Sequence, residues 1–467
     1  MLLRLAATTA VRRRLALTSH SNYYYYQRGS SALLFSSSSL LSSSSTVDDE
    51  DTTNNTKRVL QLDTLIVGGG LAGLATGAAL QAIANVQPVH IVEARNYIEC
   101  EDNAEGAAIQ LGPNAFKAFD QMGGRAFVDD IYQAGSRIDQ TIMLLPNNRP
   151  MLTLPNTAYD DTGYPIVLIR WCRLQALLRE LVRTTATTHT STDRESATVM
   201  SYDEKYATIS GYLQQKGTIN TTTNNRSRRR DTTTVYPIDA QGYKVPMPTA
   251  SSSSSASSFY PRLIIGADGL HSVFRQRIQQ QQQNKAAVLK DNGRLNIKAV
   301  VAMDLQQLMN QEENQYEEQD TENVEGAASS SSLSTYAQFL EGQVAAFAGP
   351  AGTKHTYWAI SVPDEASSET DGTSTKQFLA DIDYKKDKHT AKQLLLEKLQ
   401  QSSNTANENN KNEKDTASSS SSSWIIKLVE QTDPDTILFD RSMEATVQPH
   451  DSFVSNDGHI VLVGDAA

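Results

Sequence analysis

The chain has very little cysteine, with only Cys100 and Cys172 among its 467 residues. Two thiols cannot build a framework of several disulfides, and they are too few for a four-cysteine zinc site. Long apolar runs are also missing. The most apolar stretch, residues 65–80, is shorter than the roughly 20 residues that cross a bilayer, and its glycines weaken a helix. The sequence therefore predicts no transmembrane segment, and any membrane contact would be peripheral.

The chain is also poor in hydrophobic residues, which make up 39%, and it carries a net charge of −11. A nucleic-acid-binding protein needs an excess of basic residues, so this charge argues against a nucleic-acid partner. The apolar shortfall comes from tracts of Ser, Thr, Asn and Gln, which cannot bury enough surface to offset the entropy of an ordered chain. We therefore expect low-complexity inserts, as mobile surface loops, at residues 218–258, 311–332 and 401–423.

Acidic residues are absent from the first 47 positions, which instead carry five arginines and many serines. A basic, Ser-rich, acid-free N-terminus is typical of an organelle transit peptide. The arginines alternate with Leu and Ala, which favours a mitochondrial address over a plastid one. We predict a transit peptide at 1–47 and a polar linker at 48–61, with a merely disordered N-terminus as the alternative.

A glycine-rich loop follows the first apolar segment. Residues 62–67 (LDTLIV) predict a buried strand, residues 68–73 (GGGLAG) follow directly, and an Ala- and Leu-rich helix and a second strand come next. In such a loop Gly68 allows the turn, Gly70 lets a pyrophosphate approach the backbone, and Gly73 lets the helix pack closely on the sheet. Glu93, 20 residues after Gly73, can accept hydrogen bonds from ribose hydroxyls and would repel a 2′-phosphate. The loop predicts a dinucleotide but leaves FAD and NAD open.

Two later motifs favour FAD. Residues 266–275 (GADGLHSVFR) are similar to the signature of the single-component flavoprotein monooxygenases, which are aromatic-ring hydroxylases with the p-hydroxybenzoate hydroxylase fold, and residues 464–467 (GDAA) match a later motif of that family. The resemblance implies that Asp268 and Gly269 lie near the FAD pyrophosphate and the path of the nicotinamide cofactor. It also implies that Gly464 and Asp465 hold the ribityl chain.

Other segments resemble the salicylate-hydroxylase branch of this family. Residues 106–115 (GAAIQLGPNA), with Ala107 among the expected cofactor contacts, and the Trp-bearing helix that begins at Trp424 carry this likeness. Residues 169–174 (IRWCRL) resemble the segment that places an arginine at a helix start, facing the flavin. We assign this arginine to Arg170, because the leucines that follow it then match the family pattern. Arg173 is the competing assignment.

The resemblance implies an α/β fold in which a Rossmann-like FAD-binding domain is interleaved with an α+β substrate domain built on a β-sheet. We expect the FAD-binding domain to comprise residues 62–140, 166–215, 259–285 and 455–467, and the substrate domain to comprise 141–165 and 290–454.

The resemblance also implies a reaction. NAD(P)H reduces FAD, O₂ adds to form a flavin hydroperoxide, and one oxygen passes to an aromatic ring or a polyene double bond of a small molecule. The sequence identifies no catalytic residue and no metal site. His271, His355, Tyr357 and Trp358 are candidate site residues, but a structural role is the expected one for each. A quinone-biosynthesis hydroxylase and, for a plastid protein, a xanthophyll epoxidase are alternatives within the family.

The family pattern extends beyond Asp465, with a His, a Pro and a glycine-rich turn that opens a helix facing the pyrimidine end of the flavin. Such a helix N-terminus would stabilise a reduced, anionic flavin. A second hypothesis is therefore that the chain is a truncated FAD-binding fragment without turnover, for which we expect weak FAD retention.

Overall fold

The structure is a computed structural model. It describes residues 60–95, 107–145, 148–187, 199–223, 226–246, 261–281, 289–309, 333–340, 343–363, 383–384, 386–409, 424–445 and 453–467, all within one compact unit that comprises residues 57–467. The predicted transit peptide and most of the predicted linker lie outside these residues.

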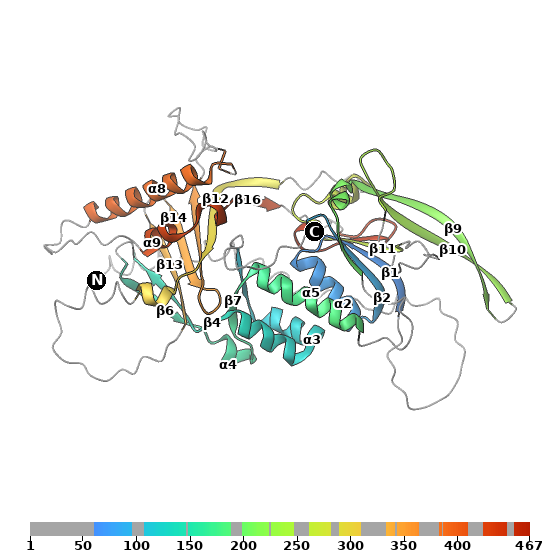
Figure 1. The fold of residues 1–467 in the computed structure, drawn as a ribbon, viewed down its shortest axis with the longest axis horizontal. Helices are drawn as coiled ribbons and strands as arrows, with labels where there is room; N and C mark the ends of the chain where they lie inside the picture. The colour runs from blue at the N-terminus through green and yellow to red at the C-terminus, as the bar shows by residue number, and fades with distance from the viewer. Residues whose placement is uncertain are drawn as a thin grey trace, which may run out of the picture. The chain divides into compact units, whose positions relative to one another are not determined.

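A five-stranded, fully parallel sheet forms the first layer of the fold (Figure 1). Its strand order is β17 (Ile460–Leu462), β11 (Leu263–Gly266), β1 (Leu60–Val67), β2 (Val86–Glu93) and β8 (Val199–Tyr202). Leu65, Ile66 and Val67 of β1 are buried, as expected for a central strand covered on both faces. Strands from four distant parts of the sequence therefore meet in one sheet.

Helices α2 (Leu71–Ala82), α3 (Pro113–Ala134) and α5 (Trp171–Thr187) share a hydrophobic core with this sheet. The buried residues of each helix recur at helical spacing, so one face of each helix packs on the core. Helix α6 (Val273–Gln281) belongs to a second apolar cluster, which contains Leu65, Phe274 and Leu462. Two consecutive glycines, Gly123 and Gly124, favour the end of a helix at this point in the sequence. Helix α3 instead continues to Ala134 and only breaks at Gly124, whose φ of 70° interrupts the helical backbone.

A small antiparallel sheet leads from this layer to a larger one. Strands β3 (Ala108–Leu111) and β4 (Ser136–Ile138) both pair with β7 (Ile166–Arg170). The chain passes directly from β4 into β5 (Gln140–Leu144), a strand of the larger sheet. The single residue between these strands, Asp139, therefore marks the crossing from one sheet to the other.

The larger sheet has seven strands in the order β16-β12-β15-β14-β13-β5-β6. Its pairings are antiparallel except for the one between β13 and β5. The remaining strands are β6 (Pro150–Pro155), β12 (Leu289–Val301), β13 (Ser334–Leu340), β14 (Val344–Pro350), β15 (Thr356–Pro363) and β16 (Leu438–Ala445). Buried and half-buried residues alternate along β15, as expected for a strand with one face on the core.

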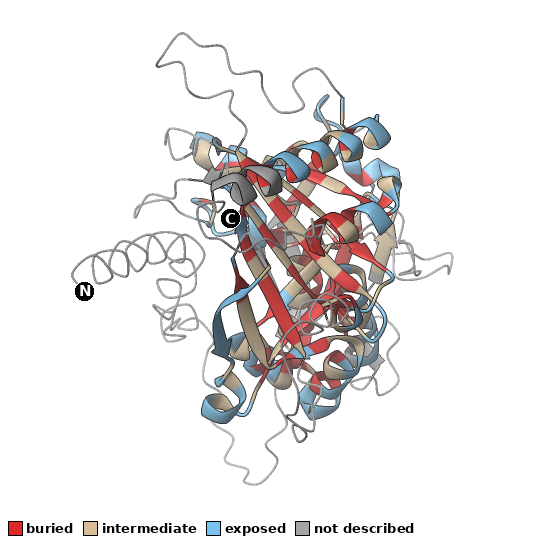
Figure 2. Ribbon diagram, turned by 90° about the vertical axis from the view of Figure 1, so that its left-hand side faces the viewer, coloured by how far each residue is buried: buried red, intermediate tan, exposed pale blue. Residues whose placement is uncertain are grey.

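Helices α8 (Lys388–Asn409) and α9 (Trp424–Gln431) share a hydrophobic core with this sheet. Trp358 and Trp424 are both fully buried there, and the Trp358 Nε1 donates a 2.8 Å hydrogen bond to Thr432 Oγ1. Figure 2 shows that buried residues are concentrated along the strands and on the inward sides of the helices. The short helical turns are α4 (Ala158–Thr162), η2 (Glu204–Thr208), η4 (Pro434–Thr436) and η5 (Gly464–Ala466).

Two of the predicted inserts contain regular structure. Strands β9 (Gly211–Thr223) and β10 (Arg226–Ile238) form a long antiparallel hairpin, so the loop predicted from residue 218 onward is wrong up to residue 238 (Figure 1). The cause is the high threonine content, because a β-branched residue that is too polar for a core still favours a strand. The insert predicted from residue 401 likewise begins inside α8, and the one at 311–332 lies outside the described residues.

The predicted fold class, a mixed α/β protein with a parallel sheet and further β-sheet layers, is confirmed. None of the described helices is both long and apolar enough to cross a membrane.

Candidate cofactor site

The three glycine motifs meet at one edge of the parallel sheet. Val67, the last residue of β1, is aligned with Val92 of β2 and with Gly266 of β11, and Gly266 is in turn aligned with Leu462 of β17. The carboxyl ends of these strands therefore lie side by side. In open α/β sheets this edge is where ligands bind.

Close backbone contacts hold the motifs against one another. A Cβ on Gly68, whose φ is +112°, would lie 2.2 Å from the Ala267 carbonyl oxygen, so the first and second motifs touch through backbone alone. A Cβ on Gly464 would lie 2.5 Å from the Cβ of Ala72, which places the third motif on the first turn of α2. Any larger residue at Gly68 or Gly464 would push the motifs apart.

Glu93 is fixed by backbone donors. Its Oε2 accepts a 2.7 Å hydrogen bond from the Gly69 N–H, and its Oε1 accepts one of 2.9 Å from the Arg95 N–H. Each carboxylate oxygen can accept more than one hydrogen bond, so Glu93 keeps acceptor capacity for hydroxyl groups. The glycine loop and the acid at the end of β2 therefore form one unit, as the spacing in the sequence predicted.

The start of α2 is open to an anion. Gly70 is its N-cap, with extended backbone and no side-chain hydrogen bond, and no acidic residue occupies the first turn. A Cβ on Gly70 would meet no atom within 4 Å, in contrast to Gly68 and Gly73. The first N–H groups of a helix have no partner within it and carry a partial positive charge. This arrangement leaves both the space and the donors that a phosphate group needs.

Asp268 has one occupied and one unoccupied carboxylate oxygen. Its Oδ2 accepts a 2.9 Å hydrogen bond from the Val273 N–H at the start of α6, whereas its buried Oδ1 has no hydrogen-bond partner among the described residues. A buried acceptor without a donor costs about 1–3 kcal/mol. A ligand hydroxyl would remove that cost. The adjacent Gly269 has a φ of +82° and open space beside it.

Arg275 links the second motif to the third, a role that the sequence did not predict. It is 7% exposed; its Nη1 donates a 3.1 Å hydrogen bond to the Asp465 carbonyl oxygen, and its Nη2 donates to the Leu270 carbonyl oxygen. Its own N–H donates to the buried Ser272 hydroxyl at 3.1 Å. Asp465 itself is exposed. The sequence feature that could have indicated this link is that Ser272 and Arg275 both belong to the family-like motif at residues 266–275.

Arg170 is the last residue of β7, and Ala107 directly precedes β3, the strand that pairs with β7. Arg170 ends β7, where it pairs with Ala108, and the next residue, Trp171, donates to the Ala107 carbonyl oxygen at 2.8 Å. Arg170 is 4% exposed, whereas Arg173 is exposed.

Helix α5, which begins directly after Arg170, contacts the glycine loop. In its second turn Gln175 donates from Nε2 to the Gly69 carbonyl oxygen at 3.0 Å. Gln175 is a second residue that sequence reasoning missed, because one polar position on an amphipathic helix gives no signal.

The other candidate site residues have the following surroundings. Trp358 is a core residue, as favoured from the sequence. Tyr357 packs against Phe347, with ring centroids 6.2 Å apart, and burial together with Asp440 raises the pKa of Tyr357 to about 12. His271 is exposed, so the local packing role favoured for it is wrong. Among the described residues, no cluster of His, Cys, Asp or Glu could hold a metal ion.

No protein-family model matches the chain, and no curated protein matches it in sequence. Solved structures do match. HpxO from Klebsiella pneumoniae, complexed with FAD and uric acid, is 15% identical with a TM-score of 0.51, over 87% of this chain and 73% of HpxO. CtdE in complex with FAD and a substrate is 15% identical with a TM-score of 0.50, over 87% of this chain and 74% of CtdE. The chain therefore has the fold of these FAD-complexed proteins.

Proposed function

We propose that the protein is an FAD-dependent monooxygenase that uses NAD(P)H and O₂ to hydroxylate an aromatic small molecule. The observation that carries this proposal is the convergence of three distant motifs at one edge of the parallel sheet, in contact through Gly68 and Ala267 and through Gly464 and Ala72. Likeness in fold to proteins crystallised with FAD supports the cofactor. The residues of the second and third motifs favour FAD over NAD.

The described residues fit FAD. The open N-terminus of α2 at Gly70 would receive the pyrophosphate, and Glu93 would accept hydrogen bonds from the adenosine ribose. The partnerless Oδ1 of Asp268 and the exposed carboxylate of Asp465 are acceptors suited to hydroxyl groups of the cofactor. We assign the remaining predicted contacts to Gly68, Gly73, Ala107, Arg170, Gly269 and Gly464.

When bound, FAD supplies the redox chemistry, namely acceptance of hydride from NAD(P)H and activation of O₂. The protein's part is binding and orientation. Glu93 is held by two backbone donors and Asp465 by Arg275, so neither carboxylate segment needs to reorganise when a ligand arrives. We name no catalytic base, because no described side chain has the geometry that would assign one.

Finer features of the proposal rest on the sequence. Residues 106–115 and the helix that begins at Trp424 favour the salicylate-hydroxylase-like branch, with epoxidation of a polyene as the variant reaction. We propose a mitochondrial location from the N-terminal 47 residues. We propose that the parallel sheet carries the cofactor and the seven-stranded sheet carries the substrate site.

Cofactor binding can be tested at Gly70. Asn and Asp are both good helix N-caps, so Gly70→Asn and Gly70→Asp should keep α2 folded while they fill the open space. We expect FAD to bind at least tenfold more weakly to Gly70→Asn and weaker still to Gly70→Asp, because the carboxylate repels the pyrophosphate. Flavin fluorescence titration measures the affinity, and thermal melts of the FAD-free variants check folding. Equal FAD affinity in the unchanged protein, Gly70→Asn and Gly70→Asp would contradict the proposed pyrophosphate site.

Oxygenation is a separate test on the FAD-loaded protein. Aromatic carboxylates and phenols are screened for stimulated NADH or NADPH oxidation, and products formed under ¹⁸O₂ are analysed by mass spectrometry. We expect one ¹⁸O atom in the hydroxylated product. FAD binding without any labelled product would instead support a flavin-binding protein without turnover.

A further inference from the structure

The glycine loop of the candidate cofactor site is held one peptide unit at a time, where a unit is the carbonyl of one residue and the N–H of the next. In the Val67–Gly68 unit, the carbonyl oxygen accepts from the Ala267 N–H and the N–H donates to the Val92 carbonyl oxygen, both at 2.8 Å. The backbone around the parallel sheet therefore fixes this first unit.

The Gly68–Gly69 unit is fixed by two residues that the sequence had indicated. Its N–H donates to Glu93 Oε2 at 2.7 Å. A Cβ on Gly73 would lie 1.9 Å from its carbonyl oxygen, so the backbone of α2 packs directly against that oxygen. Rotation of this second unit would break the bond to Glu93 and disturb the packing on α2.

The Gly69–Gly70 unit depends on a single side chain. Gln175 Nε2 donates a 3.0 Å hydrogen bond to its carbonyl oxygen, and its N–H has no hydrogen-bond partner within the described part of the chain. Both residues are glycines, which adopt positive φ as readily as negative φ, so the backbone itself does not prevent this unit from turning over. Among the described residues, Gln175 therefore forms the one hydrogen bond that holds the third unit.

Gln175 can hold the unit because its helix is fixed beside the loop. Leu174 and Leu178 on α5 are buried in the same hydrophobic core as Leu74 on α2. A glutamine amide can donate or accept a hydrogen bond, and here its nitrogen faces the Gly69 carbonyl oxygen. The amide is uncharged, so it acts on the adjacent peptide and adds no long-range attraction for an anion.

The orientation of the Gly69–Gly70 unit determines what the loop offers to a ligand. The carbonyl and the N–H of a trans peptide point in opposite directions. With the carbonyl turned toward Gln175, the Gly70 N–H faces the other side of the loop, at the open N-terminus of α2. After a reversal of the unit, a carbonyl oxygen would face that side instead, and its partial negative charge would repel a phosphate oxygen.

We propose that Gln175 is a positioning residue for the cofactor, because it holds the Gly69–Gly70 unit with its N–H turned toward the pyrophosphate. Gln175 acts through this peptide and does not itself touch the cofactor. The inference rests on the proposed FAD site, and it adds to that site a residue that lies outside all three glycine motifs.

Two changes of nearly equal side-chain size test this role by flavin fluorescence titration. Gln175→Met holds neither orientation, so the fraction of protein with the competent loop falls and FAD should bind roughly three- to tenfold more weakly. Gln175→Glu can only accept at neutral pH, which favours the reversed unit with the Gly70 N–H turned to the carboxylate. We expect FAD to bind at least tenfold more weakly to Gln175→Glu than to the unchanged protein, and more weakly than to Gln175→Met.

Gln121 provides the matched control, because it is an exposed glutamine on α3. Gln121→Met and Gln121→Glu should bind FAD as the unchanged protein does. Thermal melts of the FAD-free variants check that all of them fold. A crystal structure of FAD-free Gln175→Glu should show the Gly69–Gly70 unit reversed, which a merely structural role for Gln175 does not predict.

Acid should reverse the defect in Gln175→Glu. A protonated carboxyl group is again a donor, and an ordinary glutamate has a pKa of about 4.3. The FAD affinity of Gln175→Glu, relative to the unchanged protein, should therefore rise several-fold between pH 7.5 and pH 5.5. The same ratio for Gln175→Met should stay constant, because other groups such as Glu93 titrate in all of these proteins.

The outcomes separate this role from the proposed function. If the unchanged protein binds FAD and both Gln175 variants bind it equally well, the positioning role is wrong and the FAD site stands. An unreversed Gly69–Gly70 unit in Gln175→Glu, or a pH-independent affinity ratio, would also overturn the role. If the unchanged protein binds no FAD, the proposed function and the positioning role both fail.

Discussion

His90 is an ionisable residue within the parallel sheet. It lies on β2, aligned with Leu65 of β1 and Val199 of β8, and it is 2% exposed. Burial lowers its pKa from 6.5 to about 4, because the charged imidazolium loses its hydration there. His90 is therefore neutral in the folded protein at neutral pH.

This shift predicts acid sensitivity. The folded-state pKa lies below the unfolded one, so the unfolded chain binds more protons between pH 6.5 and about 4. The contribution of neutral His90 to the free energy of unfolding is fully present above pH 6.5 and is lost as the pH falls toward 4. The loss is about 3 kcal/mol, at roughly 1.4 kcal/mol per pKa unit. Urea unfolding at pH 7 and pH 4.5 should show this loss and show less of it in His90→Val. His389→Gln, which changes an exposed histidine on α8, should keep the full loss.

Arg275 joins two elements, α6 and η5, across the ends of β11 and β17. Arg275→Met should leave the Leu270 and Asp465 carbonyl oxygens without this donor and cost about 2–3 kcal/mol, as hydrogen bonds to charged groups do. Hydrogen exchange should then speed up in residues 453–467, and FAD affinity should fall.

Arg275→Lys should give hydrogen-exchange rates and an FAD affinity between those of the unchanged protein and Arg275→Met. A single ammonium group cannot reach both carbonyl oxygens as the two amino groups of a guanidinium do. Arg277→Met, an exposed change on the same helix, is the control. If exchange in residues 453–467 stayed unchanged in Arg275→Met, the proposed link between the motifs would be wrong.

Elements with a strong local pattern could be predicted from the sequence. Strand β1, the glycine turn and α2 have consistent signals, as apolar residues run into glycines and then into a helical repeat. The β9–β10 hairpin could not be predicted, because the Thr-rich part of its sequence shows no alternation of apolar and polar residues, and the pairing of its two strands is not visible in either strand alone. The continuation of α3 past Gly124 was missed because a glycine at positive φ ends many helices, whereas here Phe127, Val128 and Ile131 continue the buried face.

For the molecule as a whole, sequence motifs predicted which residues belong together, but not how they are joined. Gly68, Glu93, Asp268 and Gly464 were predicted as parts of one site, and the register of the parallel sheet gathers them. The joining contacts through Arg275 and Gln175 depend on side chains from distant helices. Spacing along the chain does not encode such contacts.

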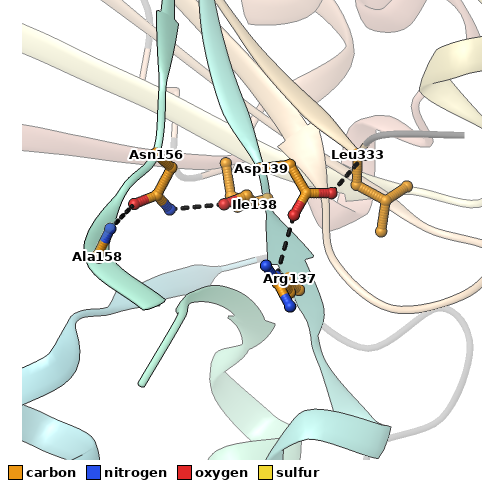
Figure 3. Close-up of polar contacts among 6 residues, drawn as sticks. All are labelled: Arg137, Ile138, Asp139, Asn156, Ala158 and Leu333. Carbon is orange, nitrogen blue, oxygen red and sulfur yellow. Dashed lines mark hydrogen bonds and ion pairs between the residues drawn. The ribbon is translucent and has the colours of Figure 1, made fainter. Parts of the chain in front are cut away.

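The three-stranded sheet beside the cofactor site and the seven-stranded sheet are connected at the β4–β5 crossing, which Asn156 contacts. The Asn156 side chain donates a hydrogen bond to the Ile138 carbonyl oxygen (Figure 3). Its backbone N–H donates to the Asp139 carbonyl oxygen at 2.7 Å. Loss of the side-chain bonds in Asn156→Ala should therefore weaken the connection between the sheets by about 1–2 kcal/mol.

The consequence should be visible as a loss of cooperativity. In a Trp171→Phe background the remaining tryptophans, Trp358 and Trp424, report on the core of the seven-stranded sheet, while bound FAD reports on the parallel sheet. The two unfolding transitions in urea should coincide in that background and separate in Asn156→Ala. Thr157→Ala, which removes only an exposed hydrogen bond to Asp161, should keep them coincident. Coincident transitions in Asn156→Ala would show that other contacts couple the two sheets.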